Sequence, residues 1–137
     1  MNILNKKSGF TLTEVLVIVI VIGILAAAGV PYYKDHLERQ KAAIGITDLR
    51  MIADSVERYL TLHPDATPEL RLLDIDIEDD EGTYNNGNFT FSIKDSYIIG
   101  ERNTGEYNLR FTLGDEPKLC CHGNDNICSD KLNLESC

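Results

Sequence analysis

The sequence lacks the short motifs that mark common catalytic sites. It contains no G-x-S-x-G nucleophile motif, no phosphate-binding P-loop and no H-E-x-x-H zinc motif. Its three histidines stand in unlike contexts: His36 inside a predicted helix, His63 before a proline and His122 among cysteines. We therefore expect neither an enzyme nor a bound cofactor.

Basic residues are also scarce, since 13 Lys and Arg stand against 22 Asp and Glu, a formal net charge of −9. Affinity for nucleic acid comes largely from basic groups that displace counterions from phosphates. General nucleic-acid binding is therefore not expected. A local DNA-binding patch stays open as an alternative.

The dominant positive feature is an apolar run from Phe10 to Val30 that contains one ionisable side chain, Glu14. As an α-helix the run would extend about 31 Å, roughly the hydrocarbon thickness of a bilayer. Its Leu, Ile, Val and Phe residues favour insertion by about 4 to 8 kcal/mol, whereas one charge inside the membrane costs about 3 kcal/mol. The run is therefore predicted to span a membrane, and a carboxylate kept inside it is predicted to be functional.

The residues at the start of this run resemble the N-terminus of type IV pilins. The segment Lys6-Lys7-Ser8-Gly9 precedes Phe10-Thr11-Leu12-Thr13-Glu14 and the unbroken apolar stretch. The resemblance implies that residues 1–9 form a leader, which a prepilin peptidase removes between Gly9 and Phe10. It also implies that the new N-terminal Phe10 is methylated.

The same resemblance assigns roles inside the helix. It places the family's assembly carboxylate on Glu14 and its helix-kink positions on Gly23 and Pro31. In a filament, the amine of Phe10 on a neighbouring subunit would then be the partner of Glu14, because a buried pair offsets part of the cost of removing a carboxylate from water. Thr13 departs from the family pattern, which usually has Ile or Leu there.

Two other kinds of N-terminal segment, a secretory signal peptide and a simple membrane anchor, share some of these features. Lys6 and Lys7, the apolar core and Ala26-Ala27-Ala28 also outline an ordinary secretory signal peptide. A simple one-span anchor would explain the hydrophobicity alone. Neither accounts for Glu14 near the start of the core.

Residues 10–33 are predicted to form the transmembrane or filament-core helix, and residues 34–62 an amphipathic continuation of it. Pro31 is expected to kink or break the helix locally. Beyond it, apolar residues recur four and three apart along one face: Ala42, Ile46, Leu49, Ala53, Val56 and Leu60. We expect this stripe to pack on the protein's own head, with a coiled-coil partner as the alternative, and His63-Pro64 to end the helix.

Residues 63–113 are predicted to form a connecting loop and an antiparallel sheet. The acidic stretch 65–88 is expected to be a solvated loop with a candidate edge strand at Ile75 and Ile77. Its acidic series lacks the glycine and the bidentate Glu of an EF-hand loop, which counts against calcium. Three strands are expected at 89–93, 97–99 and 107–113, joined by short hairpin connections. The predicted fold class is α+β: a long N-terminal helix packed on a small antiparallel sheet, followed by a disulfide-bonded C-terminal loop.

Residues 114–137 are predicted to form that loop, and they contain all four cysteines. Cysteines clustered in a small exported domain predict disulfides. Adjacent cysteines rarely pair with each other, so two arrangements remain: Cys120–Cys128 with Cys121–Cys137, or Cys120–Cys137 with Cys121–Cys128.

Metal sites are the alternatives for this loop. His122 beside two cysteines suggests zinc, but the usual C-x-x-C spacing is missing. Asp115, Glu116, Asp125 and Asp130 suggest calcium, by resemblance to the C-terminal acids of major pseudopilins, although the cysteines count against it. We expect no metal.

The resemblance implies a structural pilus subunit that assembles into a homo-oligomeric helical filament, with the prepilin peptidase and the pilus assembly machinery as partners. The basic leader and acidic remainder place the N-terminus in the cytoplasm and the head outside. The subunit would wait in the inner membrane and then join an extracellular filament. The alternatives are a pseudopilin of a type II secretion or competence machine, and a membrane-anchored binding module. Motility, adhesion and DNA uptake stay open.

Overall fold

The computed structural model describes residues 9–77, 79–114, 116–124 and 126–137. Most of the predicted leader lies outside these residues, as do Glu78, Asp115 and Asp125 of the acidic segments. The chain divides into two compact units, Met1–Leu37 and Glu38–Cys137. One helix, α1 (Leu12–Leu62), supplies residues to both units.

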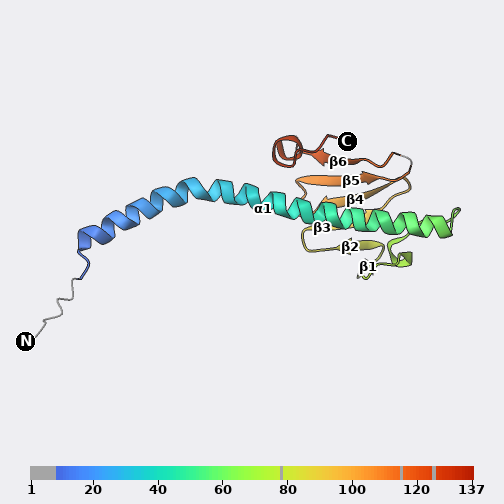
Figure 1. Ribbon diagram of the computed structural model, residues 1–137, viewed down its shortest axis with the longest axis horizontal. Helices are drawn as coiled ribbons and strands as arrows, with labels where there is room; N and C mark the ends of the chain where they lie inside the picture. Colours follow the sequence, from blue (N-terminus) through green and yellow to red (C-terminus); the bar gives the residue numbers. More distant parts are fainter. Residues whose placement is uncertain (1–8, 78, 115, 125) are drawn as a thin grey trace, which may run out of the picture. The chain divides into compact units, whose positions relative to one another are not determined.

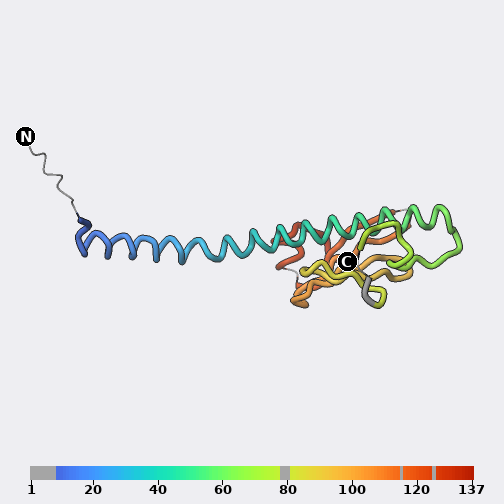
Figure 2. The backbone as a smooth tube through the Cα atoms, turned by 90° about the horizontal axis from the view of Figure 1, so that it is seen from below, coloured from blue at the N-terminus to red at the C-terminus, as the bar shows by residue number. Residues whose placement is uncertain are grey.

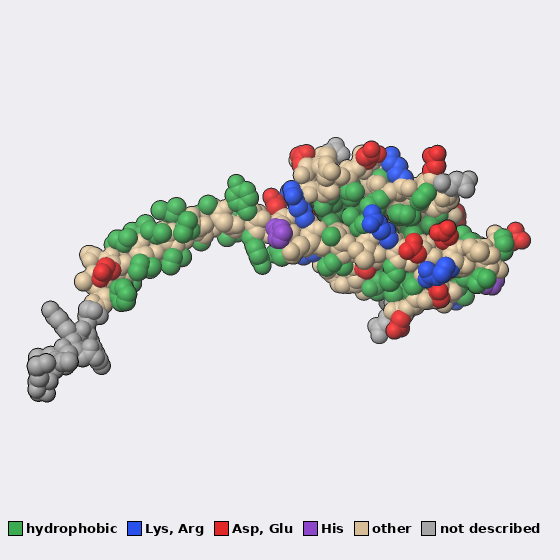
Figure 3. All heavy atoms as spheres, viewed as in Figure 1, with side chains coloured by type: hydrophobic (Ala, Val, Ile, Leu, Met, Phe, Trp, Pro, Cys, Tyr) green, Lys and Arg blue, Asp and Glu red, His purple; other side chains and the backbone are tan. Residues whose placement is uncertain are grey.

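The first unit consists, in its described part, of the N-terminal portion of α1 and the residues before it. Its large apolar side chains from Phe10 to Tyr33 are exposed, and hydrophobic groups cover this portion of the helix on the face seen in Figure 3. The helix continues through Gly23 and Pro31, so the proline does not end it. The predicted kinks at these two positions stay a prediction.

The second unit is an α+β head. Its sheet is an antiparallel meander in which neighbouring strands follow chain order, β1 to β6 (Figure 1). The strands are β1 (Asp79–Asp80), β2 (Thr83–Asn85), β3 (Phe89–Ile93), β4 (Tyr97–Arg102), β5 (Tyr107–Thr112) and β6 (Leu119–Gly123). Residues 38–62 of α1 run along one face of the sheet, as a second layer (Figure 2). The predicted fold class is confirmed.

The three predicted strands are present as β3, β4 and β5. Strand β4 extends three residues beyond the predicted end at Ile99, because it pairs with β3 through Arg102 and with β5 through Glu101. The candidate strand at Ile75 and Ile77 was wrong. There the backbone turns, with Ile77 N–H donating to the Ile75 carbonyl at 3.1 Å, and both side chains pack against the core.

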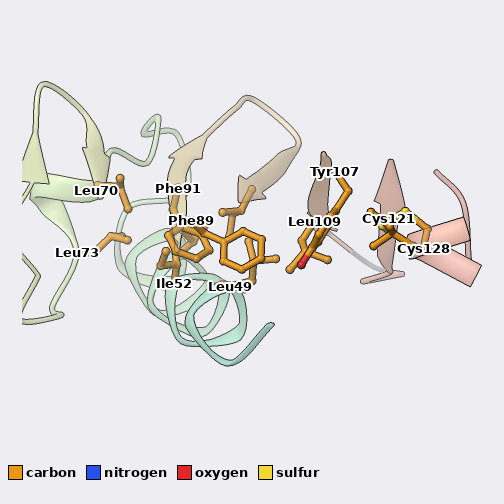
Figure 4. Packing of buried hydrophobic residues seen from close by; sticks show 14 residues of the cluster. Leu49, Ile52, Leu70, Leu73, Phe89, Phe91, Tyr107, Leu109, Cys121 and Cys128 are labelled. Atoms are coloured by element: carbon orange, nitrogen blue, oxygen red, sulfur yellow. A yellow bond between two sulfur atoms is a disulfide. The ribbon is translucent and has the colours of Figure 1, made fainter. Parts of the chain in front are cut away.

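The core lies between the helix and the sheet (Figure 4). Leu49, Ile52 and Val56 of α1 are completely buried. Leu49 and Val56 belong to the stripe predicted from the sequence, whereas Ile52 does not. Cross-strand pairing places Phe91, Gly100, Leu109 and Cys121 in one row across β3 to β6, and all four residues are buried. Helix α1 ends at Leu62, before His63-Pro64, as predicted.

A glycine lets the helix approach the sheet closely. Gly45 is buried in α1, and a Cβ at this position would lie 2.8 Å from Cε2 of Phe89 and 3.2 Å from Cδ1 of Leu109. Helix interiors disfavour glycine by about 1 kcal/mol relative to alanine. The close contact with the aromatic ring explains why a glycine stands here.

The remaining short helices flank the sheet. The turn η1 (Leu70–Leu72) follows α1 and buries Leu70, and the π-helical turn η2 (Asn126–Lys131) follows β6 and buries Ile127 and Cys128. The segment predicted as a plain C-terminal loop therefore also contains a strand and a helical turn. Its disulfides are Cys120–Cys137 and Cys121–Cys128, the second of the two arrangements that the sequence left open.

Candidate functional site

The start of α1 holds Glu14 in a reciprocal capping arrangement with Thr11. Thr11 precedes the first helical residue, and its backbone N–H and its hydroxyl each donate to Oε2 of Glu14 at 2.8 Å. In return, the Glu14 backbone N–H donates to the Thr11 hydroxyl oxygen at 3.3 Å. This is a capping box, which satisfies backbone donors that have no partner inside the helix. The T-x-x-E pattern that signals it is visible in the sequence, but our sequence analysis missed it.

The capping box explains how the chain tolerates a carboxylate inside an apolar segment. Helix N-termini carry a partial positive charge, so an anion in the first turn is favourable there. Hydrogen bonds from the chain itself replace part of the hydration that a carboxylate would lose in a membrane. Within the part of the chain that the structure describes, both hydrogen bonds that Thr11 donates to the Glu14 carboxylate end on its Oε2 atom.

The surface around Glu14 is apolar and unprotected. Phe10 and Leu12 are 81% and 83% exposed, and no part of the most apolar stretch of α1 is buried. Phe10, Thr13, Glu14, Val17 and Ile18 together line a shallow hollow of ≈ 390 Å³. The structure therefore brings Phe10 and Glu14, both predicted from the sequence, to one surface. An apolar surface of this extent needs lipid or other protein to cover it.

The head contains a second charged cluster, which sequence analysis missed. Glu38 of α1 accepts two hydrogen bonds from Arg102 of β4, from Nε at 2.7 Å and from Nη2 at 3.2 Å. The hydroxyl of Tyr107 in β5 donates to the same carboxylate at 3.0 Å. Arg102, which is 6% exposed, also donates from Nη1 to the carbonyl of Asn88 at 2.6 Å and lies over the ring of Phe89. These contacts join α1 to two strands.

Ionisation in this cluster follows from its geometry. The hydrogen bonds from Arg102 lower the pKa of Glu38 below its ordinary value, and burial opposes that shift. Burial raises the pKa of Tyr107, and the adjacent Glu38 carboxylate raises it further. The cluster is therefore a carboxylate, a guanidinium and a neutral phenol at neutral pH. The charges of Glu38 and Arg102 are paired with each other inside the head. We therefore interpret the cluster as a structural contact that holds the helix on the sheet.

Two smaller polar contacts fix the loops of the head. Asp74 lies in the connecting segment and accepts two hydrogen bonds from Arg58 of α1, at 3.0 Å and 2.8 Å. Asp48 accepts a hydrogen bond from the Asn86 side chain, whose own oxygen accepts from the backbone N–H of Phe89. The sequence had suggested only a solvated acidic loop around Asp74.

The metal sites that the sequence left as alternatives gain no support from the described residues. In the described part of the chain, no three His, Cys, Asp or Glu side chains gather as metal ligands. All four cysteines are in disulfides. The calcium alternative for the C-terminal loop depended in part on Asp115 and Asp125, which lie outside the described residues.

The fold and the helix surface together define a class: a small α+β head carried on a helix that is long and apolar enough to cross a membrane. Residues 4–30 match the family model described as the prokaryotic N-terminal methylation motif. Fimbrial protein Q of Moraxella bovis is 32% identical over 114 residues, which cover 81% of this chain and 71% of the relative. The chain belongs to the type IV pilin family.

Two further relatives are similar to shorter parts of the chain. Type IV major fimbrial protein FimA of Dichelobacter nodosus is 35% identical over 84 residues, 58% of this chain and 50% of the relative. Type II secretion system core protein G of Pseudomonas aeruginosa is 37% identical over 55 residues, 40% of this chain and 39% of the relative. The chain thus matches about half the length of the FimA relative. No solved structure matches the chain significantly.

Proposed function

We propose that this chain is a structural subunit of a type IV pilus, which waits in the inner membrane and then assembles into an extracellular helical filament through its N-terminal helix. The observation that carries the proposal is the exposed apolar surface of α1, with one carboxylate held at its first turn. Lipid covers such a surface before assembly, and helices of other subunits cover it afterwards. The relationship to fimbrial proteins supports the same function.

Processing creates the partner that Glu14 needs. A prepilin peptidase that cuts between Gly9 and Phe10 leaves a new amine on Phe10, which a methyltransferase then modifies. Because the hydrogen bonds from Thr11 end on Oε2, the second oxygen of Glu14 can accept from this amine on a neighbouring subunit. The pair fixes the register between subunits more than it adds strength, since desolvation of both charges offsets much of their attraction.

Intact-mass analysis of the protein from membranes tests the processing step. The expected mass corresponds to a chain that begins at Phe10 and carries one methyl group. Gly9→Val should leave the leader attached, while Gly29→Val, a matched change within the helix, should be processed normally. A chain that begins at Gly29, after Ala28, would identify a conventional signal peptide and contradict the proposal.

A second function is favoured by the similarity to core protein G, namely a pseudopilin of a type II secretion machine. Electron microscopy of the sheared surface fraction separates the two. Long filaments that contain this chain support a pilus subunit, whereas short assemblies that stay in the envelope support a pseudopilin. A stable monomer in the membrane would instead identify an anchored binding module and contradict both.

A further inference from the structure

The segment Glu135–Cys137, here called the cover segment, lies along the free side of β6. The Cys121 N–H donates to the Glu135 carbonyl at 2.9 Å, and the Cys137 N–H donates to the Cys121 carbonyl at 3.0 Å. Cys121 and Ser136 form a parallel bridge. Since β6 is the last strand of the sheet, the cover segment occupies the outward backbone N–H and carbonyl of Cys121, which an edge strand would otherwise present to other chains.

The two disulfides hold this region from opposite faces of β6. Successive residues of a strand point to opposite faces, so the adjacent Cys120 and Cys121 are directed apart. Cys121 and Cys128 are 0% and 3% exposed and belong to the hydrophobic core. Cys120 is also buried, but its partner Cys137 is exposed. A reductant in solution therefore meets one disulfide at an exposed residue, while the other is enclosed.

Few other contacts described in the structure hold the cover segment. Glu135 pairs with Lys118 at 2.6 Å, but both side chains are largely exposed, and such surface pairs add little stability. The preceding residue is anchored differently, because the Leu134 N–H donates to the Cys128 carbonyl at 2.9 Å and its side chain packs on the core. Release of Cys137 would consequently free the cover segment and leave the chain fixed up to Leu134.

We propose that Cys120–Cys137 is a selectively reducible clasp, and that its opening by a dithiol uncovers the edge of β6. One thiolate of the dithiol attacks the sulfur of Cys137, and Cys120 leaves as a thiolate that takes up a proton. The second thiol of the reductant then attacks the mixed disulfide and releases Cys137 as a thiol. The dithiol is oxidised to a disulfide, and Cys121–Cys128 stays closed. While it is oxidised, the clasp keeps the sheet edge at Cys121 closed to strand addition.

Partial reduction of the full chain in detergent tests the selectivity. The protein is treated with limiting dithiothreitol, trapped with N-ethylmaleimide and mapped by mass spectrometry. Cys120 and Cys137 should be labelled about tenfold faster than Cys121 and Cys128, because thiol–disulfide exchange depends on access to the attacked sulfur. Equal labelling of all four, or earlier labelling of Cys121 and Cys128, would overturn the proposal.

Hydrogen exchange tests whether the clasp keeps the edge covered. In the double variant Cys120→Ser with Cys137→Ser, the Cys121 amide should exchange at least about tenfold faster than in the unaltered chain, while the amides of β3 and β4 keep their rates. Lys118→Ala removes the exposed ion pair but keeps the clasp, so it should leave the Cys121 amide protected. If that amide stays protected in the double variant, the backbone contacts suffice and the clasp has no such role.

Discussion

Glu38 is a charged residue that links the helix of the head to its sheet. It brings a carboxylate from α1 to a guanidinium on β4 that is 6% exposed and to a phenol on β5 that is 1% exposed. A pair of this kind gives little net stability over an apolar substitute, but removal of one partner leaves the other charge buried alone. We therefore expect the head to be far more sensitive to changes at Glu38 than at its exposed carboxylates.

The pH dependence of stability provides the test at Glu38. Its pKa in the folded chain lies below the ordinary value of 4.5, so the carboxylate stabilises the fold above about pH 4.5. That contribution is lost as the pH falls through the lowered value.

Glu38→Gln should therefore reduce the free energy of unfolding at pH 7 by about 1.5–3 kcal/mol, the usual worth of hydrogen bonds to a charged group. The difference from the unaltered chain should shrink as the pH falls below 4.5. Denaturant unfolding of the full chain in detergent, followed between pH 7 and acid, measures both effects. Glu57→Gln, at an exposed position of the same helix, is the control. A constant difference at all pH values would show that the carboxylate is not the stabilising group.

The residues of this cluster show where sequence reasoning stops. Glu38 and Arg102 are separated by 64 positions and Glu38 and Tyr107 by 69, so no local pattern connects them. Glu14 is different, because a charge inside an apolar run is conspicuous by itself. The T-x-x-E capping pattern from Thr11 to Glu14 was also available in the sequence.

At the scale of elements, the packing of the head depends on the size of the contacting residues as well as on their polarity. Gly45 brings the α1 backbone close to Phe89, and Gly100 in β4 likewise lies under the ring of Phe91. Alternation of apolar residues predicted β3 and β5, and a short apolar run predicted β4. Gly45, between helix and sheet, and Gly100, which faces Phe91 within the sheet, have no place in such a pattern, and their roles appear only when the partner ring is known.

Gly45→Ala tests this close contact. Alanine improves helix propensity by about 1 kcal/mol, but its Cβ would lie 2.8 Å from the Phe89 ring, and overpacking a core typically costs about 1–3 kcal/mol. We expect the head to become less stable, by up to about 2 kcal/mol. Gly29→Ala, where no atom lies within 4 Å of the added Cβ, should leave the unfolding of the head unchanged. A stabilised Gly45→Ala variant would show that the layers can separate without cost.

The strands that sequence reasoning missed are short or unusual. β1 and β2 contain two and three residues, too few for alternation to be recognised. β6 has adjacent cysteines, both buried, because disulfides engage both faces of the strand. Such a strand shows no polar and apolar alternation, so it was predicted as loop.

Full reduction should affect the last elements and spare α1. Each disulfide closes a short loop and is expected to contribute about 2 to 4 kcal/mol to stability. Complete reduction should thus loosen β6 and η2, while the helical circular dichroism signal stays close to that of the oxidised chain. Limited proteolysis should cut after residue 114 in the reduced protein only. Loss of most of the helical signal would mean that the disulfides also maintain the long helix.

At the scale of the whole molecule, the two units carry different chemistry. The described part of the first unit is an exposed apolar helix with a capped carboxylate, and the second is a folded head with an internal salt bridge and two disulfides. We infer that assembly depends on the first unit and stability on the second. Loss of the Glu14 charge should therefore change filament yield without changing the unfolding of the head.

Filament yield from Glu14 variants tests this account most directly. Glu14→Val removes a charge that costs about 3 kcal/mol in the membrane, so insertion should be normal or improved. Assembly should fail, because a buried amine left without its anion costs about 3–5 kcal/mol at every subunit interface. Glu14→Gln can still cap the helix but has no charge, and it should fail as well.

Thr11→Ala is the matched control, since it removes the hydroxyl of the capping box and keeps the charge. Its filaments should form, with a helix weakened by about 1 kcal/mol. The measurement is the amount of each variant in membranes and in the sheared filament fraction. We predict full membrane levels for all three variants and filaments from Thr11→Ala alone; a normal filament yield from Glu14→Val would contradict the account.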